Sequence, residues 1–111
     1  MNVHFDKKEI EYYAETIAER FRRDALGEGE YEYEITIEEE IPIKLLVTIY
    51  AAYGNRVEIS HNVNGIYEKE KYCELSSITI KSSEILIGED SVFDITNAEE
   101  LERAINRKVL N

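Results

Sequence analysis

Residues 30–53 read EYEYEITIEEEIPIKLLVTIYAAY and predict two consecutive strands joined by a turn. Within residues 30–38, tyrosine and isoleucine alternate with glutamate and threonine, which is the period of a strand that buries one face. Pro42 suits the turn that follows better than the middle of a sheet. Residues 43–53 carry apolar side chains at odd and even positions, so the second strand is expected at the centre of the sheet.

The register of these two strands follows from matching their apolar residues. If Ile37 lies opposite Leu45, then Glu38 falls opposite Lys44 and the two form a cross-strand ion pair. The even positions of the first strand form an acidic face. Like charges on one face cost stability unless water, Lys44 or a binding partner relieves the repulsion.

A helix is expected at each end of the chain. Over residues 7–26, apolar residues recur at the helical period, and Asp6 and Glu9 have the spacing of a capping box. The same period recurs over residues 97–110. Two adjacent residues can serve as the N-cap of this second helix, namely Thr96 and Asn97.

The middle of the chain predicts further strands separated by turns. Gly54-Asn55 indicates a turn, Asn64-Gly65 is a strong signal for a tight hairpin, and Ser82-Ser83 indicates a break. The strands expected between these signals are 56–63, 66–72, 73–80 and 84–87. Ser82-Ser83 separates the last two of these strands, and a loop is expected after the final strand, at residues 88–91.

Helices at both ends of a run of antiparallel strands predict an α+β fold rather than alternating βαβ units. The expected architecture is a four- to five-stranded, mainly antiparallel sheet flanked by an N-terminal and a C-terminal helix, in the order α-β-β-β-β-(β)-α. No linker, repeat or low-complexity tract divides the chain, so residues 1–111 are expected to form a single globular domain.

The chain is strongly acidic, with 24 acidic and 13 basic residues and a formal net charge of −11. The stretch from Asp24 to Ile43 holds eight carboxylates and no basic residue. Such a field repels phosphate backbones and anionic membrane surfaces and attracts basic partners. Direct binding to nucleic acid or to a membrane is therefore not expected.

The sequence favours a location in the cytoplasm. It begins without a readable signal peptide, and its apolar stretches are far shorter than the roughly 20 residues that cross a bilayer. Cys73 is the only cysteine, which excludes an intrachain disulfide and suits a reducing compartment. We expect a buried or half-buried structural thiol there.

Motifs for catalysis or cofactor binding are absent from the sequence, which favours a non-enzymatic role without catalytic residues, metal or cofactor. It has no glycine-rich phosphate loop and no short metal-ligand spacing. Glu89, Asp90 and Asp94 suggest calcium, but a solvated loop is the simpler interpretation. The Asn64-Gly65 hairpin would place His61 opposite Glu68, which resembles half of a general-base pair but is expected to be an ordinary polar pair.

The acidic face is the feature that points to a function. Its glutamates lie about 6.6 to 7 Å apart along a strand, close to the roughly 7 Å between neighbouring phosphates of a nucleic-acid strand. We therefore expect a non-catalytic protein that binds a basic, nucleic-acid-binding protein, as an inhibitor or immunity-type protein that imitates nucleic-acid charge. The residues expected to bind the partner are Glu30, Glu32, Glu34, Glu38, Glu40 and Tyr50.

Two alternative functions follow from other features of the sequence. The first is a small-ligand or metal-binding module with a pocket between sheet and helices, where His61, Glu68 and Tyr72 supply polar groups. The second is a structural or accessory subunit, which would expose an apolar patch or form a homodimer through an unpaired strand edge.

Overall fold

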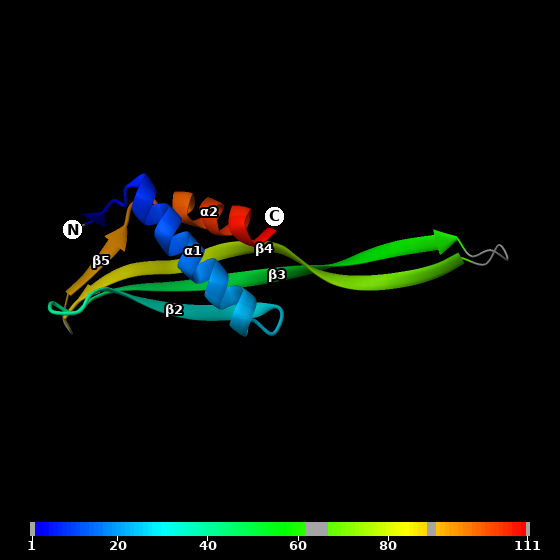
Figure 1. The fold of residues 1–111 in the computed structure, drawn as a ribbon, viewed down its shortest axis with the longest axis horizontal. Helices are drawn as coiled ribbons and strands as arrows, with labels where there is room; N and C mark the ends of the chain where they lie inside the picture. The colour runs from blue at the N-terminus through cyan, green and yellow to red at the C-terminus, as the bar shows by residue number, and fades with distance from the viewer. Residues whose placement is uncertain (1, 62–66, 89–90, 111) are drawn as a thin grey trace.

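The computed structural model describes residues 2–61, 67–88 and 91–110 (Figure 1). The elements are β1 (Asn2–Val3), α1 (Lys7–Asp24), β2 (Gly29–Glu38), β3 (Ile43–His61), β4 (Tyr67–Ile87), β5 (Ser91–Ile95) and α2 (Ala98–Leu110). They form a mainly antiparallel sheet with a helix from each end of the chain, which confirms the predicted α+β fold.

The sheet has five strands in the order β1-β5-β4-β3-β2. The pairs β2–β3, β3–β4 and β4–β5 are antiparallel, and β1 pairs in parallel with β5. Neither β1 nor β5 was predicted, because a strand of two residues has no readable period and β5 directly follows a loop signal. β1 is the edge strand and β5 lies between it and β4, so pairing with distant segments defines both strands.

The two helices cover one face of the sheet and leave the other face without a helix. They pack against each other, and α2 also packs against β4. The buried residues of β2 and β3 all have odd numbers and lie beneath the helices, and the described even residues are exposed or half-buried; the buried ones are Tyr33, Ile35, Leu45, Val47, Ile49 and Ala51. The residues of the core with no exposure at all are Ala14, Ile17, Ala18, Leu45, Val47, Ile49, Ala51, Leu101 and Ile105.

The central hairpin is much longer than predicted. β3 runs through Gly54-Asn55 and β4 runs through Ser82-Ser83, so the predicted turn and break are both wrong. Each of these residues pairs with a residue of the neighbouring strand, for example Gly54 with Glu74. Pairing of the flanking strands thus overrides the local turn preference of these short polar dipeptides.

Residues Gly54–His61 of β3 and Tyr67–Glu74 of β4 form a two-stranded arm that extends away from the helices (Figure 1). The molecule measures 67 × 24 × 20 Å, and its radius of gyration is 18.4 Å. A compact domain of this length would have a radius of gyration of about 13 Å. The arm therefore makes the molecule elongated.

The register of the arm differs from the predicted one. His61 lies opposite Tyr67, and Glu68 lies opposite Ser60, so the expected pairing of His61 with Glu68 is wrong. The predicted Asn64-Gly65 turn lies outside the described residues.

The capping box at the start of α1 is confirmed. The backbone N–H of Glu9 donates to Asp6 Oδ1 at 2.8 Å, and the N–H of Asp6 donates to Glu9 Oε1 at 3.0 Å. The helix ends at Asp24, two residues before the predicted end. Gly27 follows with a φ of 134°, a backbone conformation that residues other than glycine rarely adopt.

The side chains of Thr96 and Asn97 bond to the N-terminal segment, residues 3–5, instead of capping α2. Asn97 is buried, and its side chain accepts from Phe5 N–H at 3.0 Å and donates to Phe5 O at 2.9 Å. Thr96 Oγ1 lies 3.0 Å from His4 Nδ1. Only the backbone carbonyl of Asn97 takes part in the first turn of α2, where it accepts from Glu100 N–H at 3.1 Å.

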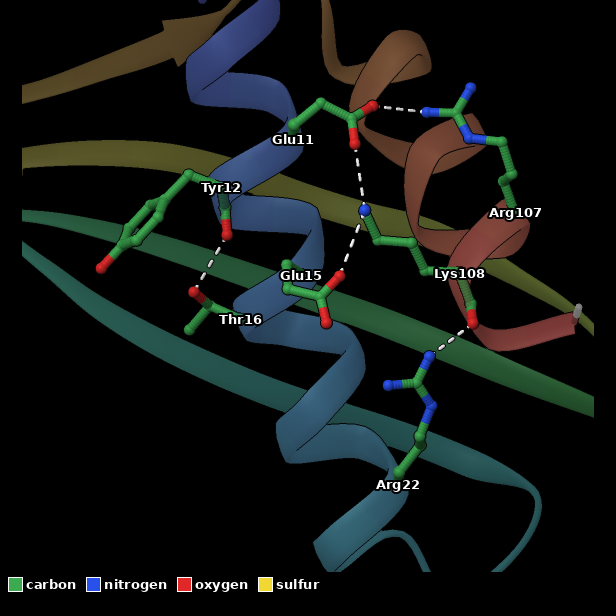
Figure 2. Close-up of polar contacts among 7 residues, drawn as sticks. All are labelled: Glu11, Tyr12, Glu15, Thr16, Arg22, Arg107 and Lys108. Atoms are coloured by element: carbon green, nitrogen blue, oxygen red, sulfur yellow. Dashed lines mark hydrogen bonds and ion pairs between the residues drawn. The ribbon is translucent and has the colours of Figure 1, made fainter.

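An ion-pair network connects the exposed sides of α1 and α2 (Figure 2). Lys108 Nζ lies 3.0 Å from Glu11 and 3.1 Å from Glu15, and Arg107 lies 2.6 Å from Glu11. The hydrogen bond from Lys108 lowers the pKa of the Glu11 carboxyl. In turn, the hydrogen bonds to Glu11 and, to a smaller extent, to Glu15 raise the pKa of Lys108. Arg22 donates to the carbonyl of Lys108 near the end of α2, which helps to fix the angle between the helices.

Candidate interaction surface

The helix-free face of the sheet presents a row of carboxylates along β2. Glu30, Glu32 and Glu34 are all exposed, and we call these three residues the acidic ladder. Their alternation with the buried Tyr33 and Ile35 fixes the direction in which they point. The predicted alternation of β2 is therefore correct over this part of the strand.

A β-bulge at the end of β2 separates the remaining predicted glutamates from this row. Ile35, not Ile37, lies opposite Leu45, and the register shifts between Thr36 and Glu38. The expected register is thus wrong by two residues. Because Ile37 is the extra residue of the bulge, Glu38 no longer shares a face with the acidic ladder.

Glu38 is the last residue of β2, and Glu40 lies in the turn between β2 and β3. Glu38 Oε1 accepts from the backbone N–H groups of Glu39 at 3.1 Å and Glu40 at 3.3 Å, so this carboxylate stabilises the turn. The predicted pair of Glu38 with Lys44 is replaced by an ion pair of 2.6 Å between Lys44 and Glu34. Of the five glutamates expected in the surface, the structure brings together three.

Tyr50 lies beside the acidic ladder, directly opposite Glu30 on β3. It is half-buried, and the Lys81 ammonium lies 5.6 Å from the centre of its ring. Lys81 is the extra residue of a second bulge, because Thr48 pairs with Ser82 and Ile49 with Ile80. Tyr50 therefore already has a cation on its ring, and a basic partner would have to replace Lys81 or bind around it.

An apolar strip lies next to the acidic ladder on the same face. It consists of Leu46 on β3, Leu86 on β4 and Val92 on β5, and Val92 is 56% exposed. Leu46 and Leu86 line a shallow hollow of about 450 Å³ that Glu32, Glu34 and Lys44 also border. The sequence indicates Val92 only as one candidate for an exposed apolar patch, and it does not place Val92 beside Leu46 and Leu86 because β5 was not predicted.

Carboxylates also border the strip on its other side. Glu84 of β4 lies opposite Asp94 of β5, and Leu46 lies opposite Glu84 in the β3–β4 register. The apolar strip is therefore flanked by Glu32 and Glu34 on one side and by Glu84 and Asp94 on the other. This arrangement suits a ligand that has an apolar centre and basic ends.

Side chains cap both sheet edges at the base of the arm. On β4, the N–H and C=O of Ile78 each bond to the Asn106 amide at 2.8 Å, and the Ile80 N–H donates to Glu102 at 2.7 Å. On β3, the N–H of Tyr53 donates to Glu28 at 3.2 Å, just past the last β2 pair at Ala51. These caps imitate a neighbouring strand and end where the arm begins.

The alternative ligand pocket between sheet and helices is not formed by the residues expected there. His61, Glu68 and Tyr72 all lie on the arm, beyond the helices. Within residues 2–61, 67–88 and 91–110, no group of three potential metal ligands comes together. Of the expected acidic loop, Glu89 and Asp90 lie outside the described residues.

Cys73 is exposed at the base of the arm, opposite Asn55, so the expectation of a buried thiol is wrong. The longer β3–β4 pairing carries this residue out of the core. In the part of the chain that the structure describes, neither helix has the length and apolar character needed to cross a membrane.

The helix-free face and the arm are thus the two surfaces that distinguish this fold. The first carries charge and apolar area, and the second carries unpaired strand edges. No protein-family model matches the chain, and no curated protein or solved structure shows significant similarity to it.

Proposed function

We propose that the protein is a non-catalytic interaction protein that binds a basic protein partner through the helix-free face of its sheet. The observation that carries the proposal is the exposed acidic ladder beside the half-exposed apolar strip. Charge complementarity would steer the encounter, and burial of apolar area would add affinity.

The chemistry of the face defines the partner. Glu30, Glu32, Glu34, Glu84 and Asp94 supply five carboxylates, and Lys44 and Lys81 supply two cations against them. The partner is therefore expected to present several basic side chains around at least one apolar side chain. A nucleic-acid-binding protein fits this description, because its basic groove normally faces phosphates at a spacing similar to that of the acidic ladder.

A pair of matched variants tests the proposal. Glu30→Lys/Glu32→Lys and Glu39→Lys/Glu40→Lys both change the net charge from −11 to −7, since each replaces two negative charges by two positive ones. The first pair lies on the helix-free face and the second in the β2–β3 turn. Affinity capture from source-cell lysate at low and high salt, followed by titration with the purified partner, compares them.

We expect a basic protein to bind the wild type and Glu39→Lys/Glu40→Lys at low salt, and to be lost at high salt and with Glu30→Lys/Glu32→Lys. Competition by nucleic acid would show that the partner uses its nucleic-acid-binding groove. Equal loss with both variants would show that net charge, and not this face, governs binding. Salt-insensitive binding would contradict the proposal altogether.

We also propose a cytoplasmic location. The free thiol of Cys73 is exposed, and such a thiol persists more readily in a reducing compartment than in an oxidising one. Labelling of this thiol in intact cells, compared with labelling after lysis, would test the location.

A further inference from the structure

Beyond the pairs that β3 and β4 make with β2 and β5, the arm has two open strand edges, one on β3 and one on β4. In the described part of the chain, β2 pairs with β3 only as far as Ala51, and β5 pairs with β4 only from Glu84 onward. Beyond these limits β3 and β4 pair with each other alone. An isolated two-stranded ribbon is marginally stable in water, and long open edges invite further strands.

The backbone of β3 shows which residues of its open edge can accept a strand. Tyr53 N–H points away from β4, because Glu28 holds it on the side where β2 lies. Alternate residues of a strand direct their N–H and C=O groups to the same side. Asn55, Val57 and Ile59 therefore direct theirs to the open edge, and Val57 lies midway between Tyr53 and the strand end at His61.

We propose that this edge of β3 pairs antiparallel with the same edge of a second copy of the chain, around a two-fold axis at Val57. This register places Arg56 opposite Glu58 of the second copy, and symmetry repeats the pair. Opposite charges in directly opposed positions stabilise an antiparallel pair. The register also uses the whole of this edge among the described residues, because Tyr53 then lies opposite His61 and β2 begins where the incoming strand ends.

Neighbouring registers of the same edge are less favourable. Directly opposite residues must lie on the same face of the ribbon, so odd residues stay opposite odd ones. The allowed registers therefore have their two-fold axis at successive residues. An axis at Arg56 places two arginines opposite each other, and an axis at Glu58 places two glutamates opposite each other. The axis at Val57 is thus selected by charge, and it also centres the pairing on the described edge.

The edge of β4 does not pair with its own copy in this way. Its lysines, Lys69 and Lys71, occupy odd positions, and its glutamates, Glu68, Glu70 and Glu74, occupy even positions. Antiparallel pairing of identical edges matches odd with odd and even with even residues. An axis at any residue from 69 to 72 therefore sets like charges opposite each other, which disfavours this edge. The outcome is a closed dimer with a four-stranded ribbon rather than a fibre.

Charge reversal with rescue tests the dimer. Sedimentation equilibrium over a wide concentration range should show a monomer–dimer equilibrium for the wild type. Arg56→Glu or Glu58→Arg turns two attractive pairs into two repulsive ones and should raise the dimer Kd about thirty-fold. The double variant Arg56→Glu/Glu58→Arg should restore the dimer. An equimolar mixture of the two single variants should form a heterodimer, since every pair in it is again opposite in charge.

Two further variants separate edge pairing from other causes. Lys69→Glu makes the same change of charge as Arg56→Glu, but on the β4 strand, and should leave the dimer Kd unchanged. Val57→Pro removes an N–H that points away from β4 and should abolish the dimer while the arm stays folded. A wild type that is monomeric at every concentration, or single variants that dimerise like the wild type, would overturn the proposal. The helix-free face takes no part in this edge pairing, so the two proposals succeed or fail separately.

Discussion

Asn97→Ala is expected to lower the free energy of unfolding by about 2 to 5 kcal/mol, because it leaves two buried backbone groups without partners. Asn97 is 7% exposed and Phe5 is 3% exposed. The amide bonds both the N–H and the C=O of Phe5, at 3.0 and 2.9 Å. An unsatisfied buried backbone group costs about 1 to 3 kcal/mol, so the loss is a large part of a total stability of roughly 5 to 15 kcal/mol.

Urea unfolding followed by circular dichroism measures this change. With a slope of about 1.5 kcal/mol per molar urea, the midpoint should fall by about 1.3 to 3.3 M while the slope stays the same. Thr96→Ala is the matched control, because Thr96 is the adjacent residue, is exposed, and also contacts the N-terminal segment. Its loss should stay below about 1 kcal/mol.

Hydrogen exchange supplies a second, local readout. In the wild type the Phe5 N–H should be strongly protected, and Asn97→Ala should remove that protection. A stability loss no larger than that of Thr96→Ala, or an unchanged protection of Phe5, would refute the argument that this amide holds the N-terminal segment.

Three other changes have defined outcomes. Asn106→Leu should lower the free energy of unfolding by about 2 kcal/mol and speed exchange of the Ile78 N–H in hydrogen-exchange experiments, because the amide makes two bonds to that backbone. Tyr33→Phe should raise stability by about 1 kcal/mol in urea titrations, because the Tyr33 hydroxyl is buried with no hydrogen-bond partner among the described residues. Burial raises the Tyr33 pKa to about 12, so the unfolded chain loses this proton first and wild-type stability should fall between pH 10 and 12 more than that of the variant. Lys108→Met should destabilise the protein at neutral pH, because it removes the cation beside Glu11. The difference in stability between wild type and variant should shrink as pH falls below about 4.5 and through the lowered pKa of Glu11, where this carboxyl takes up a proton. Thermal unfolding at several pH values measures this difference.

The parts of the fold that could be predicted are those that local patterns determine. The capping box at Asp6 and Glu9 is a contact between residues three apart, and the alternation of Tyr33 and Ile35 with glutamates requires only a sheet with one covered face. Both patterns are complete within a few residues. The structure therefore has them as predicted.

The parts that could not be predicted depend on residues far apart in the sequence. Gly54-Asn55 has the local character of a turn, and only its pairing with residues 73 and 74 keeps it in a strand. The caps on the sheet edges join residues 25 and 28 positions apart, Glu28 with Tyr53 and Ile78 with Asn106. The bulge at Ile37 moved Glu38 out of the expected surface, and the unbroken alternation of the sequence gives no sign of such an irregularity.

The extension of the arm away from the helices has a consequence for how this protein can change over evolution (Figure 1). A two-stranded ribbon that extends beyond the helices can be lengthened or shortened by two residues in each strand, since such a step keeps every remaining side chain on its face. The body under the helices would not need to be repacked. The reach of the arm can therefore be adjusted independently of the stability of the domain that carries it.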